Sequence, residues 1–479
     1  AYTGTVNIST SSANGNWSVN DADNVTNPNP DNDDNGSVDY SFLVSDAGEI
    51  ILDLNNSQAD TLTISVSDAF LAVTSTSVTV NFSDNVFIFN EDPVQVAGRP
   101  QAMTIEMWTN NGSNCFNDAS YNYSPQALDA SIDRAGVLPG ANDPSIGGVS
   151  IPDGPGSAGL SLDFSAVPGQ AGFNLDSSDV GQYRLTITDN TNVHSVGVIV
   201  GTSNLLTVRP FGIAVSNITA PGPVVNTGGS LPGDNIFTVA GGNFSATVAG
   251  VLWDAADDSN NDGVISPPEA GVYFDNAVAP SYAWNTTLGV SLAPTTFTPE
   301  PGTPGSLNNG LILQAEFSGG AFNVIDLQYT EVGSFPLHSS AINYLGAGVE
   351  IPGDDIVVGR FIPASFDVSI PAAPNGQFDD TCGGITYIGQ DFTYSTAPTV
   401  TINAQNALGA TTIQYKDGFS KLLETGVSVD ASQDEIAVDI DGNPMLVSYT
   451  RVPMTDVRNN GTVDFTFGAD DYRYGPDLP

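Results

Sequence analysis

The segment TLTISVSD, residues 61–68, decides the fold class of this chain. Its apolar side chains Leu62, Ile64 and Val66 alternate with threonines and serines. Successive side chains of a β-strand point to opposite faces of a sheet, so this alternation predicts a strand with one buried face. The alternation returns in YRLTITDN (183–190), NFSATVAGVLW (243–253) and VDFTFG (463–468), which predicts strands along most of the chain.

Turn-forming residues separate these predicted strands. The chain holds 50 glycines and 31 prolines, and it has turn dipeptides at Asn35-Gly36, Asp441-Gly442 and Asn460-Gly461. Helical periodicity is nearly absent, and residues 119–135 are the one weak candidate for a helix. Short strands with frequent turns predict an all-β protein of tandem immunoglobulin-like antiparallel β-sandwich domains.

An acidic stretch, DDSNNDGVISPPEAG at residues 257–271, has the ligand order of an EF-hand calcium loop. Calcium is a hard cation that takes about six to eight oxygen ligands, and Gly263 stands where such a loop turns sharply. Pro267-Pro268 departs from the EF-hand, because prolines keep a helix from starting at its usual place. The alternative is an acidic turn that holds no ion. The predicted ligands are Asp258, Asn260, Asp262, the carbonyl of Val264, Ser266 and Glu269.

A second acidic loop, DNDDNGSVD at residues 31–39, matches the same template less well. Position 12 of this loop is Phe42, so the bidentate acid would have to come from another segment. A plain surface turn is the alternative. The predicted calcium ligands here are Asp31, Asp33, Asn35, Ser37 and Asp39.

Length and two strand–proline–strand segments predict four domains. A chain of 479 residues is too long for one small core. In LLTVRPFGIAV (205–215) and GRFIPASFDVSI (359–370), a strand leaves one domain and enters the next through a proline, which cannot donate to a strand ladder. We predict β-sandwich domains at 1–84 and 85–208, a third at 209–362 with the inserted EF-type loop, and a C-terminal β-domain at 363–479 whose completeness stays open.

Charge and cysteine usage limit the partners. Fifty-four acidic residues face ten Lys and Arg, for a net charge of −44. This charge repels nucleic acid and anionic membranes, and it favours divalent cations or a solvated extracellular surface.

No apolar run reaches the roughly 18 residues of a membrane span. No signal peptide begins at Ala1, which fits a mature secreted chain or a trimmed fragment. Cys115 and Cys382 leave a disulfide open, and no Cys/His cluster predicts zinc.

Motifs of common catalytic sites are absent from the sequence. It contains no GxSxG, no HExxH, no Walker loop and no Rossmann fingerprint. His194 and His338 are the only histidines, and both read as structural or surface residues. Trp108, Trp253 and Trp284 favour core packing over a sugar-stacking surface. We therefore predict that the protein is not an enzyme.

Several segments resemble one known family. DLQYTEVGSFPLHSSAINYLG (326–346), VVGRFIPASFDVSI (357–370), ITYIGQDF (385–392) and TINAQNALGATTIQY (401–415) resemble the MshQ-like proteins of the mannose-sensitive haemagglutinin type IV pilus system. VRPFGIAVSN (208–217) and FTVAGGNFSATVAGVLWDAADDSNNDG (237–263) are similar to that family as well. YTGTVNISTSSANGNWS (2–18) and SDAGEIILDL (45–54) resemble its β-units more weakly.

The resemblance implies an exported, multidomain β-protein associated with a pilus, with an adhesive or tip role and no catalytic residues. It makes the acidic loop a family feature at Asp257, Asp258, Asp262 and Gly263. Members of the family continue past the equivalent of RYG at 473–475, whereas this chain ends at Pro479, which leaves the completeness of the last domain open.

We therefore expect a non-enzymatic, calcium-stabilised structural or adhesive protein of the bacterial cell surface. The expected partners are components of a pilus or another surface filament, with a carbohydrate or host-surface ligand as a further expectation. One alternative is an array of carbohydrate-binding modules, which an exposed Trp or Tyr beside residues 258–269 would favour. Another is a filament subunit with an unpaired or swapped edge strand. A hydrolase would need a pocket of convergent carboxylates.

Overall fold

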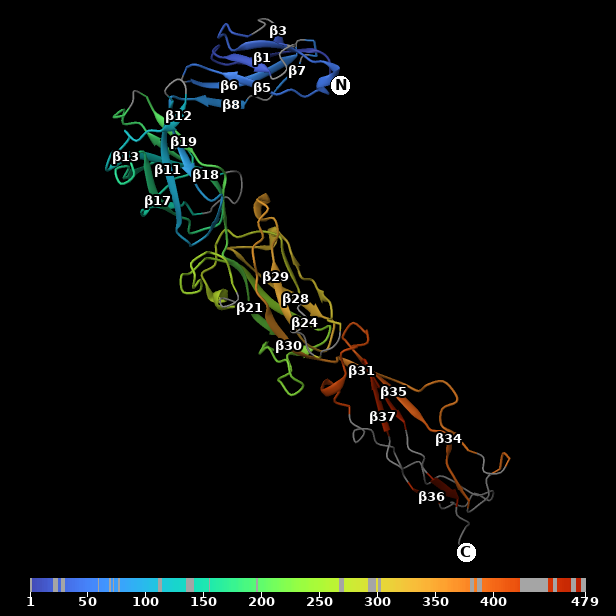
Figure 1. Cartoon of the computed structure of the whole chain (residues 1–479). Coiled ribbons are helices and arrows are strands. Elements are labelled where there is room, and N and C mark those ends of the chain that lie inside the picture. Colours follow the sequence, from blue (N-terminus) through green and yellow to red (C-terminus); the bar gives the residue numbers. More distant parts are fainter. Residues whose placement is uncertain are drawn as a thin grey trace.

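A computed structural model gives the fold of the chain (Figure 1). It describes residues 2–19, 25–26, 31–58, 60–68, 70–71, 73–75, 78–110, 114–134, 142–154, 156–194, 197–266, 271–291, 299, 303–379, 383–385, 390–422, 447–450, 455–466 and 471–474. In these residues the regular structure is β-strand and short 3₁₀ turns, and no helix is long and apolar enough to cross a bilayer. The predicted all-β class is confirmed.

The strands fall into four groups that follow one another along the chain and, in Figure 1, form a row from the N-terminus to the C-terminus. We call them units 1 to 4, with strands between residues 5 and 82, 85 and 209, 212 and 362, and 365 and 474. No sheet among the described residues takes strands from two units.

Unit 1 holds a six-stranded antiparallel sheet and a two-stranded one. The alternating segment at 61–68 forms its central strand, and Leu62 is fully buried as predicted. Val6, Ile8, Trp17, Val38 and Tyr40 form its core. The large sheet contains β1 (Thr5–Thr10), β3 (Val25–Thr26), β4 (Ser37–Ser41), β6 (Asp60–Asp68), β7 (Val73–Thr74) and β8 (Val78–Phe82), and the small one β2 (Asn16–Val19) and β5 (Leu52–Asn55).

Unit 2 is a twelve-stranded network in which β10 and β20 pair in parallel and β13 pairs with β16 and β18. The weak helix candidate at 119–135 is wrong: residues 126–134 form a strand whose side chains alternate between buried and accessible. The strands are β9 (Asn85–Asn90), β10 (Val94–Val96), β11 (Gln101–Asn110), β12 (Cys115–Asn117), β13 (Gln126–Arg134), β14 (Ser145–Ile146), β15 (Val149–Ser150), β16 (Ala158–Leu162), β17 (Gln170–Asp176), β18 (Gly181–Asp189), β19 (Ile199–Thr202) and β20 (Leu206–Arg209).

Unit 3 is a sandwich of two five-stranded sheets with an immunoglobulin-like arrangement of antiparallel strands. The short strand β23 pairs in parallel with β30, the last strand of the unit, as β10 does with β20 in unit 2. One sheet contains β22 (Val224–Val225), β21 (Gly212–Ala220), β24 (Asn243–Val251), β28 (Ala321–Tyr329) and β26 (Leu307–Asn308). The other contains β23 (Thr238–Val239), β30 (Ile356–Ile362), β29 (Gly333–Ser340), β25 (Thr286–Val290) and β27 (Leu311–Ile312).

Unit 4 is built around a four-stranded antiparallel sheet, in which the predicted Asn460-Gly461 turn joins two paired strands, β37 and β38. Cys115 lies exposed in unit 2, and Cys382 lies outside the described residues. The main sheet contains β31 (Ser365–Ser369), β35 (Thr399–Gln405), β38 (Thr462–Thr466) and β37 (Thr455–Asn459). Two small sheets contain β32 (Gln377–Phe378) with β34 (Tyr394–Thr396), and β33 (Asp391–Phe392), β39 (Asp471–Tyr474) and β36 (Val447–Thr450).

Candidate functional site

The acidic loop after β24 lies at the junction of units 2 and 3. The backbone N–H of Trp253 donates to the carbonyl of Ala97 at 2.8 Å, which ties the start of the loop to unit 2. Nη2 of Arg99 donates to the carbonyl of Asn261 at 2.6 Å. The loop is therefore fixed to the neighbouring unit through its backbone, at both its start and its middle.

Arg209, the last residue of β20, forms buried hydrogen bonds at the same junction. Its side chain is buried, and its guanidinium donates to the carbonyls of Pro210, Phe211 and Gly263 at 2.9 to 3.0 Å. Burial lowers the pKa of Arg209, and the charge of Asp92 opposes that effect. An arginine keeps its charge under such a shift, so this group is a permanent multiple donor between the two units.

An apolar cluster lies at the same junction. Val96 from unit 2 packs with residues of unit 3, and the partly buried side chains of Trp253 and Ile265, at the two ends of the acidic loop, pack against the same cluster. The members of the cluster in unit 3 are Phe211, Ala214, Ala249, Val251 and Tyr273. The two units thus share a small core, and relative movement would expose it to water.

Inside the loop, Asp258 is the organising residue. It is only 2% exposed, and its carboxylate accepts hydrogen bonds from the indole N–H of Trp253 and the backbone N–H of Gly263, both at 2.7 Å. The N–H of Asp262 donates to its other oxygen at 3.2 Å. Trp253 therefore supports the loop with its indole nitrogen and is not the exposed sugar-stacking ring that would favour a carbohydrate module here.

The other predicted ligands of this loop lie close in sequence and interact with one another. Asn260 donates to Asp262 at 2.9 Å, and Asp262 also accepts the N–H of Val264 at 2.7 Å. Ser266 has partners of its own, and Glu269, the predicted bidentate acid, lies outside the described residues. A carboxylate oxygen has two lone pairs, so accepting an N–H leaves room for an ion. No three acidic, histidine or cysteine side chains of the described residues are already gathered as a metal centre.

The flank of this loop is strongly acidic. Burial, followed by the neighbouring charges of Asp254 and Asp275, raises the pKa of Asp257. The negative charges around Asp257 create a potential that a divalent cation would relieve.

The second predicted loop lies against β2 in unit 1. Trp17 donates its backbone N–H to Oδ2 of Asp31 and its indole N–H to the carbonyl of Gly36 at 3.1 Å. Asp33 accepts from Asn35, while Asn35 in turn accepts the N–H of Ser37 at 2.7 Å. Asp39 lies on β4, where Asn7 donates to it at 2.9 Å.

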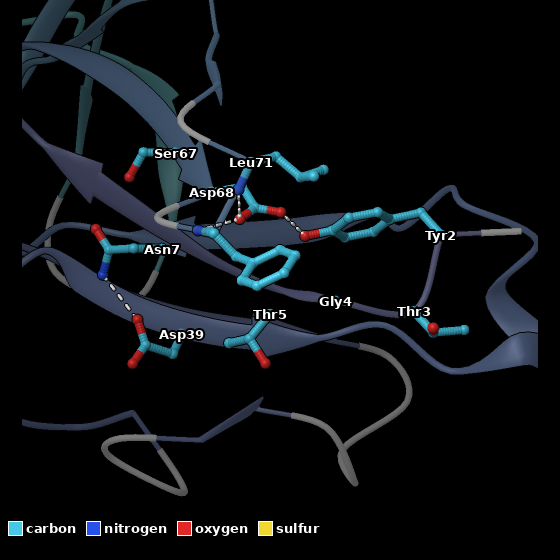
Figure 2. Close-up of a pocket in the computed structure, with 10 residues that line it drawn as sticks. Tyr2, Thr3, Gly4, Thr5, Asn7, Asp39, Ser67, Asp68 and Leu71 are labelled. Carbon is cyan, nitrogen blue, oxygen red and sulfur yellow. Dashed lines mark hydrogen bonds between the residues drawn. The ribbon is translucent and has the colours of Figure 1, made fainter.

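A hollow of about 780 Å³ opens at one end of unit 1 (Figure 2). Tyr2 lies across it and donates its hydroxyl to Asp68, which also accepts the backbone N–H of Leu71 at 2.9 Å. The Tyr2 hydroxyl, followed by the N–H of Leu71, holds the pKa of Asp68 below its ordinary value. Phe70 stands beside them with its side chain 95% exposed. The other lining residues are Thr3, Gly4, Thr5, Asn7, Asp39 and Ser67.

Strand register places this hollow at the free end of unit 1. Phe82, where the chain leaves for unit 2, pairs with Asp60 at the start of β6, while Asp68 is the end of the same strand. The hollow and the junction with unit 2 are therefore at opposite ends of one strand. Further exposed apolar residues at the free end lie between β4 and β5 and from the end of β6 to β7, at Leu43, Val44, Ile51, Leu71 and Val73.

Units 3 and 4 are joined by a buried carboxylate. Glu331 accepts the backbone N–H groups of Ile413 and Gln414, each at 3.1 Å. Burial raises the pKa of Glu331 even though these hydrogen bonds lower it. The backbone N–H of Ala407 donates to the carbonyl of Ala240 at 2.8 Å, and the side-chain amide of Asn406 donates to the carbonyl of Thr330 at 3.0 Å.

The junction arginines carry little signal in the sequence. Arg209 precedes the proline of a strand–proline–strand segment, and it is one of only ten basic residues in the chain. The rarity of basic residues, together with the position of Arg209 at a predicted domain boundary, was the one signal in the sequence that pointed to this residue. Nothing in the spacing links Arg99 to Asn261, or Tyr2 to Asp68.

Family models match the C-terminal half of the chain. The second domain of DUF6701 matches residues 209–325, and the third domain matches residues 331–477. The chain carries DUF6701 domains. The second-domain model ends at residue 325, inside β28, and the third-domain model begins at residue 331, just before β29, so the boundary lies inside unit 3. The MshQ-like and pilus assignments stay predictions.

Comparison with solved structures gives weak likenesses. The D0-D1 domain of Intimin is 13% identical, with 57% of this chain and 98% of that chain covered and a TM-score of 0.16. A marsupial T cell receptor is 12% identical over 82% and 94% of the two chains, with a TM-score of 0.17. Escherichia coli alpha-2-macroglobulin activated by porcine elastase is 12% identical over 78% and 31%, with a TM-score of 0.19. No curated protein matches the chain.

Proposed function

We propose that this chain is a non-enzymatic structural or adhesive protein of the bacterial surface, in which tandem β-sandwich units carry the free end of unit 1 toward a target. The observation that carries the proposal is the junction of units 2 and 3. There, Arg99 and Arg209 bind the backbone of the acidic loop over a shared apolar cluster. Such a junction favours a stiff series of units over freely hinged domains.

Calcium is the ion we propose for the loop at 258–269. Supporting this are the ligand order of the sequence, the buried Asp258 that organises the loop, and the acidic flank around Asp257. An ion bound there would stiffen a segment that already joins two units. A pilus or another surface filament is the partner we propose, on the sequence resemblance alone.

Adhesive contact would come from the apolar side chains at the free end of unit 1. Phe70 and Leu71 are exposed there, beside a hollow with hydroxyl, amide and carboxylate groups. Exposed apolar patches on a soluble protein mark interaction surfaces, and loops at the end of a β-sandwich are free to vary.

The test compares beads coated with the full chain for retention on polystyrene and on immobilised cell-surface material. The variant Phe70→Asp with Leu71→Asp should lose most of the retention. A matched pair, Val224→Asp with Val225→Asp, changes two exposed apolar residues of unit 3 and adds the same charge. Beads coated with this control variant should be retained as strongly as beads coated with wild type. Equal retention of all three proteins would count against adhesion through unit 1.

A second candidate function, binding of neutral saccharides, is favoured by the hollow itself. An exposed aromatic ring beside Asn7 and Asp39 offers both a stacking face and polar partners for hydroxyls. Unit 1 has no basic residue to attract an anionic sugar. An array of neutral and anionic glycans separates the two candidates. Signals on neutral glycans that Phe70→Asp removes support saccharide binding, and a silent array with persistent polystyrene retention supports apolar adhesion.

A further inference from the structure

Asp31 in unit 1 is a buried carboxylate with half of its hydrogen-bonding capacity unused. The residue is 8% exposed, and Oδ2 accepts the backbone N–H of Trp17. Its Oδ1 is also buried and finds no hydrogen-bond partner among the described residues. A buried charged oxygen without a partner is costly, so the surroundings of Oδ1 point to a missing positive group.

The nearest charges around Asp31 have the wrong sign to supply that group. Asp33 lies within hydrogen-bond reach of the Asp31 carboxylate, and the charges of Asp33 and Asp34 both act on it. Two carboxylates that approach this closely must share either a proton or a cation.

No side chain of unit 1 can neutralise this group. Residues 1–84 contain twelve Asp and Glu and not one Lys, Arg or His, and the first basic residue of the chain is Arg99. A positive partner for Asp31 must therefore come from solution, or from a side chain outside unit 1.

The backbone around the cluster is held in place without any ion. Gly15 donates its N–H to Asp34 at 2.8 Å, and the N–H of Asp34 donates to Asn16 at 2.7 Å. The N–H of Gly36 donates to the carbonyl of Gly15 at 2.9 Å. The loop is thus clamped onto the start of β2, with its acidic side chains on a fixed frame.

We propose that Asp31 and Asp33 bind one divalent cation beside Trp17, in the field of the Asp34 charge, and that Ca²⁺ is the ion this oxygen set takes. Carboxylates are hard ligands, and calcium accepts irregular sets that backbone carbonyls and water complete. Of the ligands expected from the sequence, Asp33 is the one whose carboxylate lies within reach of Asp31, whereas Asn35 and Asp39 interact with Ser37 and Asn7.

The site is independent of the loop at 258–269, and the two can be told apart by their tryptophans. Trp17 donates to Asp31, and Trp253 donates to Asp258. Tb³⁺ substitutes for Ca²⁺ and emits when a neighbouring tryptophan transfers excitation to it. In the full chain carrying Trp253→Phe, the remaining short-range emission should report on the Asp31 site and should be displaced by Ca²⁺.

The decisive comparison in that background is Asp33→Asn against Asp53→Asn. Both residues are exposed in unit 1, so both variants should fold, and both remove one negative charge. Asp33→Asn should weaken the Tb³⁺ affinity by about tenfold or more, whereas Asp53→Asn should leave it nearly unchanged. Equal titrations for the two variants would overturn the proposal, since general attraction to an acidic surface treats them alike.

Two further measurements keep the proposal testable if Trp253→Phe fails to fold. Equilibrium dialysis with Ca²⁺ on the otherwise wild-type chain should find one ion fewer for Asp33→Asn than for Asp53→Asn. The melting temperature of Asp31→Asn should be lower than wild type in calcium, and equal or higher in chelator, because the amide removes an unpaired buried charge. A loss of the same size in both buffers would assign Asp31 to the Trp17 contact alone. Calcium binding that is absent at Asp258 but present at Asp31 would contradict the calcium proposed for the loop at 258–269, but not this site.

Discussion

Arg209 and Gly263 are 54 residues apart in the sequence, and Nη2 of Arg209 donates a hydrogen bond of 2.9 Å to the carbonyl of Gly263. The arginine ends the last strand of unit 2, and the glycine lies in the acidic loop of unit 3. One buried guanidinium thus joins the two units through a backbone atom, which no substitution within the loop can remove. The loop owes its position to this contact before any ion is considered.

Replacing Arg209 with methionine should therefore loosen the junction. The variant keeps much of the apolar stem but removes three hydrogen bonds to carbonyls, and we expect a loss of about 2–4 kcal/mol in the free energy of unfolding. Urea titration of the full chain measures this loss. Arg184→Met, which changes an exposed arginine of β18, should stay within about 0.5 kcal/mol of wild type. Similar losses in both variants would show that the carbonyl contacts add little.

Gly98 gives a steric test of the same junction. A Cβ at this position would lie 2.8 Å from the carbonyl oxygen and 3.1 Å from the nitrogen of Trp253, with φ at +88°. Gly148 has a similar φ of +81°, and a Cβ added there would have no heavy atom within 4 Å. Gly148→Ala should cost only the backbone strain, about 1 kcal/mol, whereas Gly98→Ala should cost about 1–3 kcal/mol more.

Limited proteolysis separates the two glycine variants further. Only Gly98→Ala should open the junction and speed cleavage between units 2 and 3. If both alanines had the same effect on stability and cleavage, close approach of Trp253 would not hold the units together.

The strands were readable from the sequence because their signal is local. In β18 the predicted inward residues Tyr183, Leu185 and Ile187 are all buried, and in β24 the same holds for Phe244 and Val248. Period-2 alternation needs only neighbouring residues to be recognised. The prediction of a helix at 119–135 was wrong because the strand at 126–134 is stabilised by pairing with β16 and β18. These strands lie elsewhere in the chain, so the local sequence does not reveal the pairing.

The candidate sites were readable only in part. The EF-type order of the acidic loop is local, and Asp258 does organise that loop. The contacts of Arg99 and Arg209 with the loop, and of Trp17 with Asp31, join residues far apart in sequence. The template puts Asp31 and Asp33 in one ligand set, but the burial of Asp31 against Trp17 depends on the tertiary fold.

Calcium should stabilise the chain through the loop at 258–269. With calcium about tenfold above the dissociation constant, an ion that binds only the folded loop adds about 1.4 kcal/mol. We expect a rise in melting temperature that chelator removes, and that both Asp258→Asn and Glu269→Ala reduce. Asp326→Asn, an exposed acid of β28, is the matched control. If the melting temperature were the same in calcium and chelator for wild type, calcium would have no structural role in this chain.

Glu331 should make the junction of units 3 and 4 weaker as pH rises. Burial holds the pKa of this side chain above its ordinary value of 4.5, so the folded state keeps the proton at pH values where the unfolded chain has lost it. The stabilisation from the protonated group is complete below the ordinary value and is lost as pH rises through the folded pKa.

The side chain of Glu331→Gln does not titrate. The free energy of unfolding of wild type should therefore fall relative to that of this variant as pH rises through the interval. Urea midpoints from acidic to neutral pH measure it, with Glu350→Gln removing an exposed carboxylate as the control. Parallel curves for wild type and Glu331→Gln would mean that the buried carboxylate does not couple the two units to pH.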